Sequence, residues 1–128
     1  MIINKLKTIS DEKGNLIPLE FEGLPFIPKR IFYVIGVPKD TERGRHAHYN
    51  TEQLLICIKG KIRVKVHNGY KWDELDMEEG ETVFIDKMIW DSQVFLTGED
   101  ILLVLSSTNY DSKDYIDDWV EFLRISGN

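Results

Sequence analysis

Two of the three histidines in this chain, His46 and His48, are separated by a single residue, just before a run of apolar residues. Side chains alternate between the two faces of a β-strand, so histidines at this spacing lie on the same face. A pair of imidazoles facing one cavity can hold a divalent metal ion, or it can accept and donate protons near neutral pH. Other residues in the sequence indicate whether the histidine pair binds a metal ion or transfers protons.

The elements that position the histidines are expected to be short β-strands. In residues 61–67, Ile62, Val64 and Val66 alternate with polar residues, which is the period of a half-buried strand. Asn68-Gly69 follows as a strong hairpin signal. Further strands are expected near residues 6–10, 16–20, 30–35, 53–58, 72–77, 82–86, 93–96 and 101–106. Many short strands separated by turns are typical of a β-sandwich or barrel.

The tail has a different period. From Ser112 onward, apolar residues recur at helical spacing, and Asp111 or Ser112 is suited to cap the helix. Residues 38–44 are polar and are expected to form a loop before the histidine strand. We therefore expect one domain, residues 1–128, built from strands and closed by a short C-terminal helix.

Composition restricts the partners of the protein. Of the 128 residues, 42% are hydrophobic and 30% charged, which is the balance of an ordinary soluble domain, and the formal net charge is −6. A negative chain has no general attraction for nucleic acid or anionic membranes, although a few arginines can still hold a small anion. The lone cysteine, Cys57, and the lack of a long apolar segment indicate a soluble protein of the reducing cytoplasm.

The His-x-His pair resembles the first motif of the cupin superfamily, whose fold is the double-stranded β-helix. In that motif a glutamate precedes the closing glycine, with six residues between them; with Gly60 as that glycine, the position holds Gln53. In the second motif, the place of a third histidine holds Asp91. An amide is a poor metal ligand, so the cage is weak for zinc or iron, although Asp91 could complete a two-histidine, one-carboxylate triad. We predict no metal and no cofactor, which disfavours a metal-dependent dioxygenase.

Without a metal, two imidazoles can act as base and conjugate acid on neighbouring atoms of one substrate. Most of the chain resembles the dTDP-sugar 3,4-ketoisomerases, the WxcM-like sugar isomerases. The resemblance rests on the segments RGRHAHYNTEQLLICIKG, FIDKMIW, ILLVLSSTNYD and DYIDDWVEFL. It implies an all-β cupin, a jelly-roll barrel with a short C-terminal helix, that forms a homodimer. It also implies metal-independent conversion of dTDP-4-keto-6-deoxyglucose into a dTDP-3-keto-6-deoxyhexose through an enediol, a step towards 3-amino sugars of surface polysaccharides.

The same resemblance assigns the catalytic residues. It makes His46 and His48 the acid and base at C3 and C4 of the hexose, without saying which of them removes the proton. Tyr33, in the expected strand 30–35, has a hydroxyl that is suited to bind the sugar or relay a proton. Packing in the core is the alternative role for this tyrosine.

Four further residues are candidates for substrate binding. Arg43 is the best one for the diphosphate, because a guanidinium binds phosphate oxygens bidentately. Arg30 is expected on the face opposite Tyr33, where it would form a surface salt bridge or reach a ligand only across a subunit interface. Gln53 can orient a histidine or a sugar hydroxyl. Trp90 is expected either to border the pocket, stacked on thymine, or to lie in the core.

Two positions depart from the family pattern. Lys13 stands where an arginine is expected, and Asp91 stands where a basic or aromatic residue is more common. Both are candidates for ligand contact in a dimer, so the configuration of the product at C4, galacto or gluco, stays open. Two other functions also stay open: a dTDP-sugar 3,5-epimerase and a cupin that binds a sugar nucleotide without catalysis.

Overall fold

In the computed structural model, which describes residues 1–127, two five-stranded sheets face each other and enclose the core. The strands are β1 (Ile3–Lys5), β2 (Ile9–Asp11), β3 (Gly14–Leu16), β4 (Arg30–Val34), β5 (Thr41–His48), β6 (Gln53–Lys59), β7 (Lys61–His67), β8 (Trp72–Glu78), β9 (Glu81–Ile85), β10 (Trp90–Phe95), β11 (Ile101–Ser106) and β12 (Tyr115–Ile116). One α-helix, α1 (Trp119–Ser126), follows them in this part of the chain.

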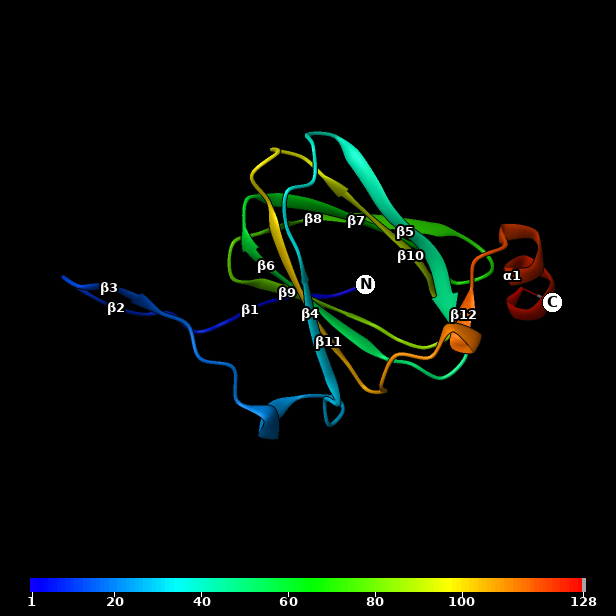
Figure 1. Cartoon of the computed structure of the whole chain (residues 1–128), viewed down its shortest axis with the longest axis horizontal. Helices are drawn as coiled ribbons and strands as arrows, with labels where there is room; N and C mark the ends of the chain where they lie inside the picture. Colours follow the sequence, from blue (N-terminus) through cyan, green and yellow to red (C-terminus); the bar gives the residue numbers. More distant parts are fainter. Residues whose placement is uncertain (128) are drawn as a thin grey trace.

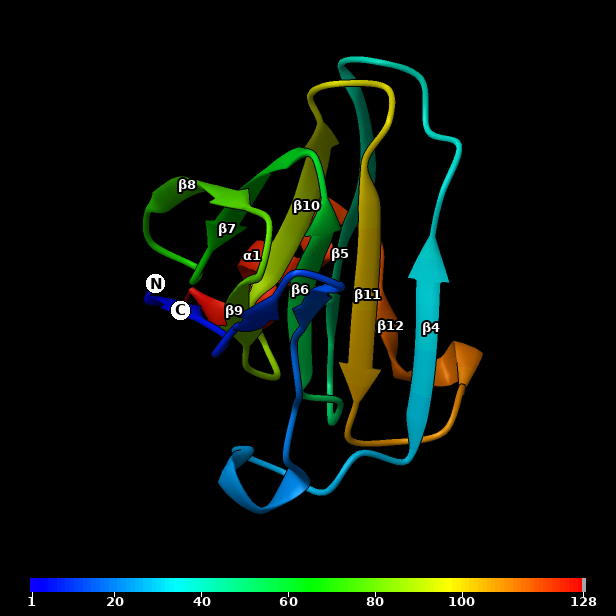
Figure 2. The same cartoon turned by 90° about the vertical axis from the view of Figure 1, so that its left-hand side faces the viewer.

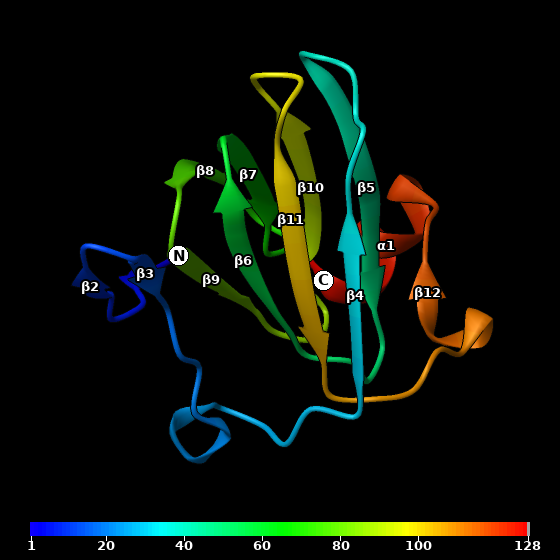
Figure 3. The ribbon, with the colours of Figure 1, turned by 60° about the vertical axis from the view of Figure 1, so that its left-hand side comes forward.

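The order of the strands is that of a jelly roll. The first sheet has the order β1-β9-β6-β11-β4 and the second β12-β5-β10-β7-β8, and every pair of neighbours is antiparallel. From β4 onward the chain passes to the other sheet at nearly every connection, and only the hairpin β7–β8 stays within one sheet. Figure 2 and Figure 3 show β6, β11 and β4 lying in front of β5 and β10. The predicted cupin double-stranded β-helix is confirmed.

Apolar side chains from both sheets meet in the interior. Their alternation along each strand directs one set inward, as expected of sheets packed face to face. The fully or largely buried members are Val37, Leu55, Cys57, Ile62, Val64, Met77, Val83, Ile85, Phe95, Leu102 and Val104. This core fixes the distance between the sheets, and with it the width of the space left for a ligand.

The hairpin β7–β8 has the register that Asn68-Gly69 predicts, with His67 paired with Trp72. Alternation along the strand places His67 on the polar face, opposite Ile62, Val64 and Val66, but the residue is buried because α1 covers this part of the outer face of the second sheet. The His67 ring is 4.9 Å from the Trp72 ring and 5.0 Å from the Trp119 ring, measured between centroids. Its Nδ1 accepts a hydrogen bond from the Gly69 backbone. His67 is therefore a packing residue of this hairpin.

The tail forms a short strand before its helix. The prediction of a helix from Ser112 is wrong in its start: Asp111 caps only a single turn of 3-10 helix over residues 112–114, and β12 follows it and pairs with β5. The α-helix begins at Trp119, after Asp118, whose carboxylate accepts hydrogen bonds from two backbone amides of the first turn. Phe122 is fully buried against the barrel of its own chain.

The hairpin β2–β3 projects from the barrel (Figure 1), and its turn carries Lys13. Both strands are shorter than predicted. No helix among residues 1–127 is long and apolar enough to cross a membrane.

Candidate active site

Strand β5 holds the histidine pair, and a change of backbone direction precedes it. Gly44 and Arg45 have φ values of +95° and +68°, in the left-handed region, and the ladder with β10 shifts register at this point. A Cβ at residue 44 would come within 3.1 Å of the Asp91 carbonyl oxygen, so glycine allows β10 to approach closely. The strand begins at Thr41, within the segment expected to be a loop.

The two histidine rings lie on the same side of β5, as the spacing predicts. Their centroids are 5.2 Å apart and the rings are nearly perpendicular. The ring of Tyr115, from β12, contacts both, at 5.0 Å from His46 and 4.4 Å from His48. Two imidazoles and a phenol therefore meet in one cluster.

His48 is held in place by a buried carboxylate. Its Nδ1 lies 3.1 Å from Oδ2 of Asp114, which also accepts hydrogen bonds from the Thr51 hydroxyl and, through Oδ1, from the Asn50 backbone. Burial alone would raise the pKa of Asp114, but these hydrogen bonds outweigh it and lower the pKa. An ionised Asp114 accepts the Nδ1 proton of a neutral His48, which leaves Nε2 with its lone pair free.

Burial keeps both histidines neutral. It lowers the pKa of His46 to about 4, helped by repulsion from the neighbouring His48. Burial also lowers the pKa of His48, although its contact with Asp114 works in the opposite direction. Near pH 7 both rings are therefore able to accept a proton.

A cavity of about 320 Å³ opens between the two sheets beside His46. A smaller recess beside His48 adjoins it, and Arg30, Gln53 and Tyr115 border both spaces. Strands β5 and β10 contribute mostly polar residues to its lining, and strands β4, β6 and β11 contribute mostly apolar ones. Its lining is Arg30, Phe32, Tyr33, Val34, Arg43, Gly44, His46, Gln53, Leu55, Asp91, Gln93, Phe95, Leu102, Val104 and Tyr115.

Two arginines from opposite sheets border the cavity, Arg30 at the start of β4 and Arg43 in β5. Arg43 is exposed at its border. Arg30 faces the cavity, with its guanidinium 4.5 Å from the Phe32 ring centroid and 5.2 Å from the Tyr110 ring centroid. The expectation that Arg30 points away from the site is therefore wrong. Gln53 is buried, and its side-chain amide is 3.3 Å from the Ser106 hydroxyl.

The structure does not bring the two other predicted residues to the histidines. Tyr33 borders the cavity, but its side chain is 65% exposed and lies on the outer face of β4 with Ile31 and Ile35. The tyrosine that contacts the histidine rings is Tyr115. Trp90 packs outside the second sheet, 5.1 Å from Trp119 and 5.5 Å from Phe122 between ring centroids. The next residue of β10, Asp91, points into the cavity instead.

Two buried side-chain polar atoms lack a hydrogen-bond partner within residues 1–127: Nε2 of His48 and Oδ1 of Asp91. An unpaired buried polar atom costs about 1–3 kcal/mol, so such atoms are rare in folded proteins. One of them borders the cavity and the other the adjoining recess. A ligand with hydroxyl or carbonyl groups would pair both atoms.

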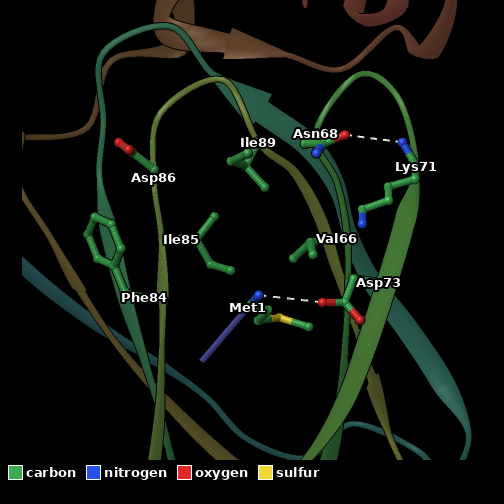
Figure 4. Close-up of a pocket in the computed structure, with 9 residues that line it drawn as sticks. All are labelled: Met1, Val66, Asn68, Lys71, Asp73, Phe84, Ile85, Asp86 and Ile89. Carbon is green, nitrogen blue, oxygen red and sulfur yellow. Dashed lines mark hydrogen bonds and ion pairs between the residues drawn. The ribbon is translucent and has the colours of Figure 1, made fainter. Parts of the chain in front are cut away.

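No group of three or more His, Cys, Asp or Glu side chains in the described part of the chain is placed to hold a metal ion. A second hollow, of about 460 Å³, lies between β8 and β9, where Val66, Ile85 and Ile89 approach one another (Figure 4). The α-amino group of Met1 pairs there with Asp73 at 3.4 Å. Neither histidine of the pair borders this hollow.

Comparison with known proteins assigns the chain to a family. The family model described as "FdtA: WxcM-like, C-terminal" matches residues 1–127. The TDP-4-oxo-6-deoxy-alpha-D-glucose-3,4-oxoisomerase of Aneurinibacillus thermoaerophilus is 30% identical over 125 residues, which are 96% of this chain and 89% of that protein. The chain belongs to this family.

Two solved structures show the same fold. QdtA, a sugar 3,4-ketoisomerase from Thermoanaerobacterium thermosaccharolyticum solved in complex with TDP, matches with a TM-score of 0.91 and 30% identity over 98% of this chain and 93% of QdtA. A 3,4-ketoisomerase from Helicobacter canadensis matches with a TM-score of 0.91 and 33% identity over 97% of this chain and 95% of the other.

Sequence reasoning missed two residues in this member of the WxcM-like family. Asp114 and Tyr115 both lie in the segment from Ser112 onward that the pattern predicts to be helical, and neither is singled out by it. Asp114 reaches His48 across 66 positions of sequence, so no local pattern links the two. The sequence offered one indication of their role: Asp114 and Tyr115 begin the segment DYIDDWVEFL, which is one of those that resemble the family.

Proposed function

We propose that this family member is a metal-independent 3,4-ketoisomerase of dTDP-4-keto-6-deoxyglucose. The observation that carries the proposal is the pair of neutral imidazoles, His46 and His48, set beside one cavity and backed by Asp114. Moving a keto group between adjacent carbons requires removal of a proton from one carbon and delivery of a proton to the next. Two imidazoles 5.2 Å apart between centroids suit two such neighbouring atoms.

We assign His48 as the base that removes the C3 proton. Its Nε2 is unpaired, and its Nδ1 is held by Asp114 at 3.1 Å, which orients the ring and stabilises the imidazolium that forms. His46, which borders the larger cavity, takes up a proton from the His48 imidazolium or from solvent and delivers it to C4 of the enediol, so that both rings end neutral. Tyr115 contacts both rings and limits how far they can move.

We assign the binding of the nucleotide to the two arginines that border the cavity. Arg30 and Arg43 are placed to bind the diphosphate, because guanidinium groups form charge-assisted hydrogen bonds with phosphate oxygens. Gln53, which borders both the cavity and the recess, is placed to hold a sugar hydroxyl. The complex of the related QdtA with TDP supports this assignment.

The test is incubation of the purified protein with dTDP-4-keto-6-deoxyglucose in D₂O, followed by NMR of the sugar. We expect a 3-keto isomer with deuterium at C4, formed without added metal. His46→Asn and His48→Asn should each slow the reaction roughly 10²–10⁴-fold. His67→Asn is the matched control, because His67 lies outside the cavity, and it should react at the unaltered rate once folding is verified.

Three outcomes would overturn the proposal. Full activity of the double variant of His46 and His48 would exclude histidine catalysis. Deuterium at C5 would indicate a 3,5-epimerase. Tight binding of the nucleotide without any exchange or conversion would indicate a binding protein.

We further infer that the protein acts as a homodimer. Ile31, Tyr33 and Ile35 form an exposed apolar face on the edge strand β4, with side chains 55%, 65% and 59% exposed. A second copy would cover this face, and the projecting hairpin would carry Lys13 towards a neighbouring subunit. Light scattering should give twice the chain mass, and Ile31→Asp should yield monomers, whereas a monomeric unaltered protein would refute the inference.

The same proposal places the reaction in biosynthesis. A 3-keto sugar is the substrate that an aminotransferase needs in order to install an amino group at C3. We therefore infer a cytoplasmic role before the 3-amino sugars of surface polysaccharides. A coupled assay with such an aminotransferase should convert the product into an amino sugar, and failure to do so would refute this placement.

A further inference from the structure

The carboxyl group of Asp91 is buried in the wall of the proposed active site. Its side chain is 2% exposed, it borders the cavity, and it faces His46 as the Cα partner in the ladder between β10 and β5. Directly opposed residues of an antiparallel pair have their side chains on the same face, about 5 Å apart at Cβ. Asp91 is therefore the carboxyl group placed beside the histidine that borders the cavity.

A neighbour on the same strand fixes the orientation of this carboxyl group. Nε2 of Gln93 donates a hydrogen bond to Oδ2 of Asp91, at 2.5 Å. Oδ1 has no partner and is one of the two unpaired buried polar atoms described above. Because Oδ2 already accepts a hydrogen bond, the proton of a neutral carboxyl group resides on Oδ1, which remains available to a ligand.

The proposed reaction leaves a task that the histidines do not perform. While the histidines act at C3 and C4, the oxygens must change too: O4 of the ketone becomes a hydroxyl, and the hydroxyl on C3 becomes a ketone. One proton must arrive at O4 and another must leave O3. A single group that first donates and then accepts completes both transfers and ends in its starting state.

We propose, on the basis of the proposed ketoisomerase function, that Asp91 is a catalytic residue that carries this hydroxyl proton. When the base removes the C3 proton, the C3–H electron pair forms the C3=C4 bond, the π electron pair of the C4=O bond moves to O4, and O4 takes the Oδ1 proton of Asp91. This step gives the enediol and an Asp91 carboxylate. When His46 protonates C4, the O3–H bond breaks, its proton moves to Oδ1, and the C3=O bond forms.

Burial supports this role, since it raises the pKa of Asp91 to about 7 and so keeps a large share of the group protonated near neutral pH. The hydrogen bond from Gln93 acts in the opposite direction and is weaker. A carboxyl group that gains and loses a proton near the working pH is suited to transfer in both directions.

The test compares the unaltered protein with Asp91→Asn on dTDP-4-keto-6-deoxyglucose in D₂O. Asparagine keeps the shape and the contact with Gln93, but it cannot release a proton. We expect product formation to fall roughly 10²–10⁴-fold, while deuterium still enters C3 of the recovered substrate, so that the ratio of exchange to product rises. Ser92→Ala, on the other face of the same strand, is the matched control and should keep the unaltered ratio.

Three other results would overturn the proposed role of Asp91. Product formation by Asp91→Asn within threefold of the unaltered rate overturns the role of Asp91 and leaves the ketoisomerase function standing. An equal loss of exchange and product, with the ratio unchanged, also overturns it, because Asp91 then only supports the site. An unaltered protein that converts no substrate overturns the proposed function, and this inference with it.

An infrared measurement tests the same residue without turnover. At pH 6 the unaltered protein, with labelled aspartate carboxyl carbon, should show the carbonyl band of a protonated carboxyl group. The band should be absent in Asp91→Asn. If the unaltered protein shows no such band, the proposal is overturned even where the variant does not fold.

Discussion

Asp91→Asn should stabilise the protein by an amount that depends strongly on pH. The side chain is buried, and its pKa rises from 3.8 to about 7 on folding. Below pH 3.8 the carboxyl group is neutral in both the folded and the unfolded chain. As the pH rises from 3.8 to 7, the unfolded chain ionises freely while the folded protein retains the proton, so Asp91 increasingly favours unfolding.

The size of the change in the free energy of unfolding follows from the shift in the pKa of Asp91. One pKa unit corresponds to about 1.36 kcal/mol, so the shift disfavours the folded state by about 4 kcal/mol once the pH exceeds 7. At pH 5 the penalty is about 1.6 kcal/mol by the same linkage. Asparagine does not ionise, so the stabilisation by Asp91→Asn should be about 3 kcal/mol greater at pH 8 than at pH 5.

Urea unfolding of both proteins at pH 5 and pH 8, followed by tryptophan fluorescence at one protein concentration, measures this difference. Asp86→Asn is the matched control, because it is the same substitution at an exposed aspartate. A stabilisation by Asp91→Asn that is the same at pH 5 and pH 8 would refute the reasoning.

Three further predictions concern other residues. Asp114→Asn should lower kcat roughly 10²-fold or more and leave the affinity for TDP unchanged, because it disturbs the orientation of the base and the stabilisation of its imidazolium but no residue assigned to the nucleotide; calorimetry with TDP and steady-state rates check this. Arg43→Ala should weaken TDP binding about 10–100-fold in calorimetry, the loss of one charge-assisted hydrogen bond, and unchanged affinity would contradict the assignment. Gly60→Ala should destabilise the fold by about 2 kcal/mol more than Gly80→Ala in thermal unfolding. Both glycines have positive φ, but of the two only residue 60 would place a Cβ against a side chain, 2.0 Å from Oδ1 of Asp100. Equal losses of stability in the two variants would show that Asp100 moves to relieve the overlap.

Local patterns predicted the strands well where neighbouring residues determine the structure. Lys61–His67 and Ile101–Ser106 have the bounds that alternation and apolar runs suggested, and Asn68-Gly69 makes the hairpin it predicts. The shared face of His46 and His48 follows from the two-residue period of a strand in the same way. In these cases the local geometry of the backbone is enough to determine the structure, so neighbouring residues suffice to predict it.

The same local patterns gave wrong predictions where contacts between distant parts of the chain determine which side of a strand is buried. Alternation correctly separates Arg30 from Tyr33, but the apolar neighbours Ile31 and Ile35 suggested that Tyr33 faces inward. In the folded chain this apolar face is exposed, so the assignment of sides was reversed. The burial of His67 beneath α1 likewise depends on a helix more than 50 residues later, which no local period reveals.

The active-site cluster draws on both ends of the barrel sequence. His46 and His48 come from an early strand, whereas Asp114 and Tyr115 come from the segment that joins β11 to α1 and docks on the edge of β5. Protein synthesis produces this segment after every other strand. A nascent chain can therefore form every other strand of its two large sheets before the proposed base is oriented, and the site is complete only when β12 has been added.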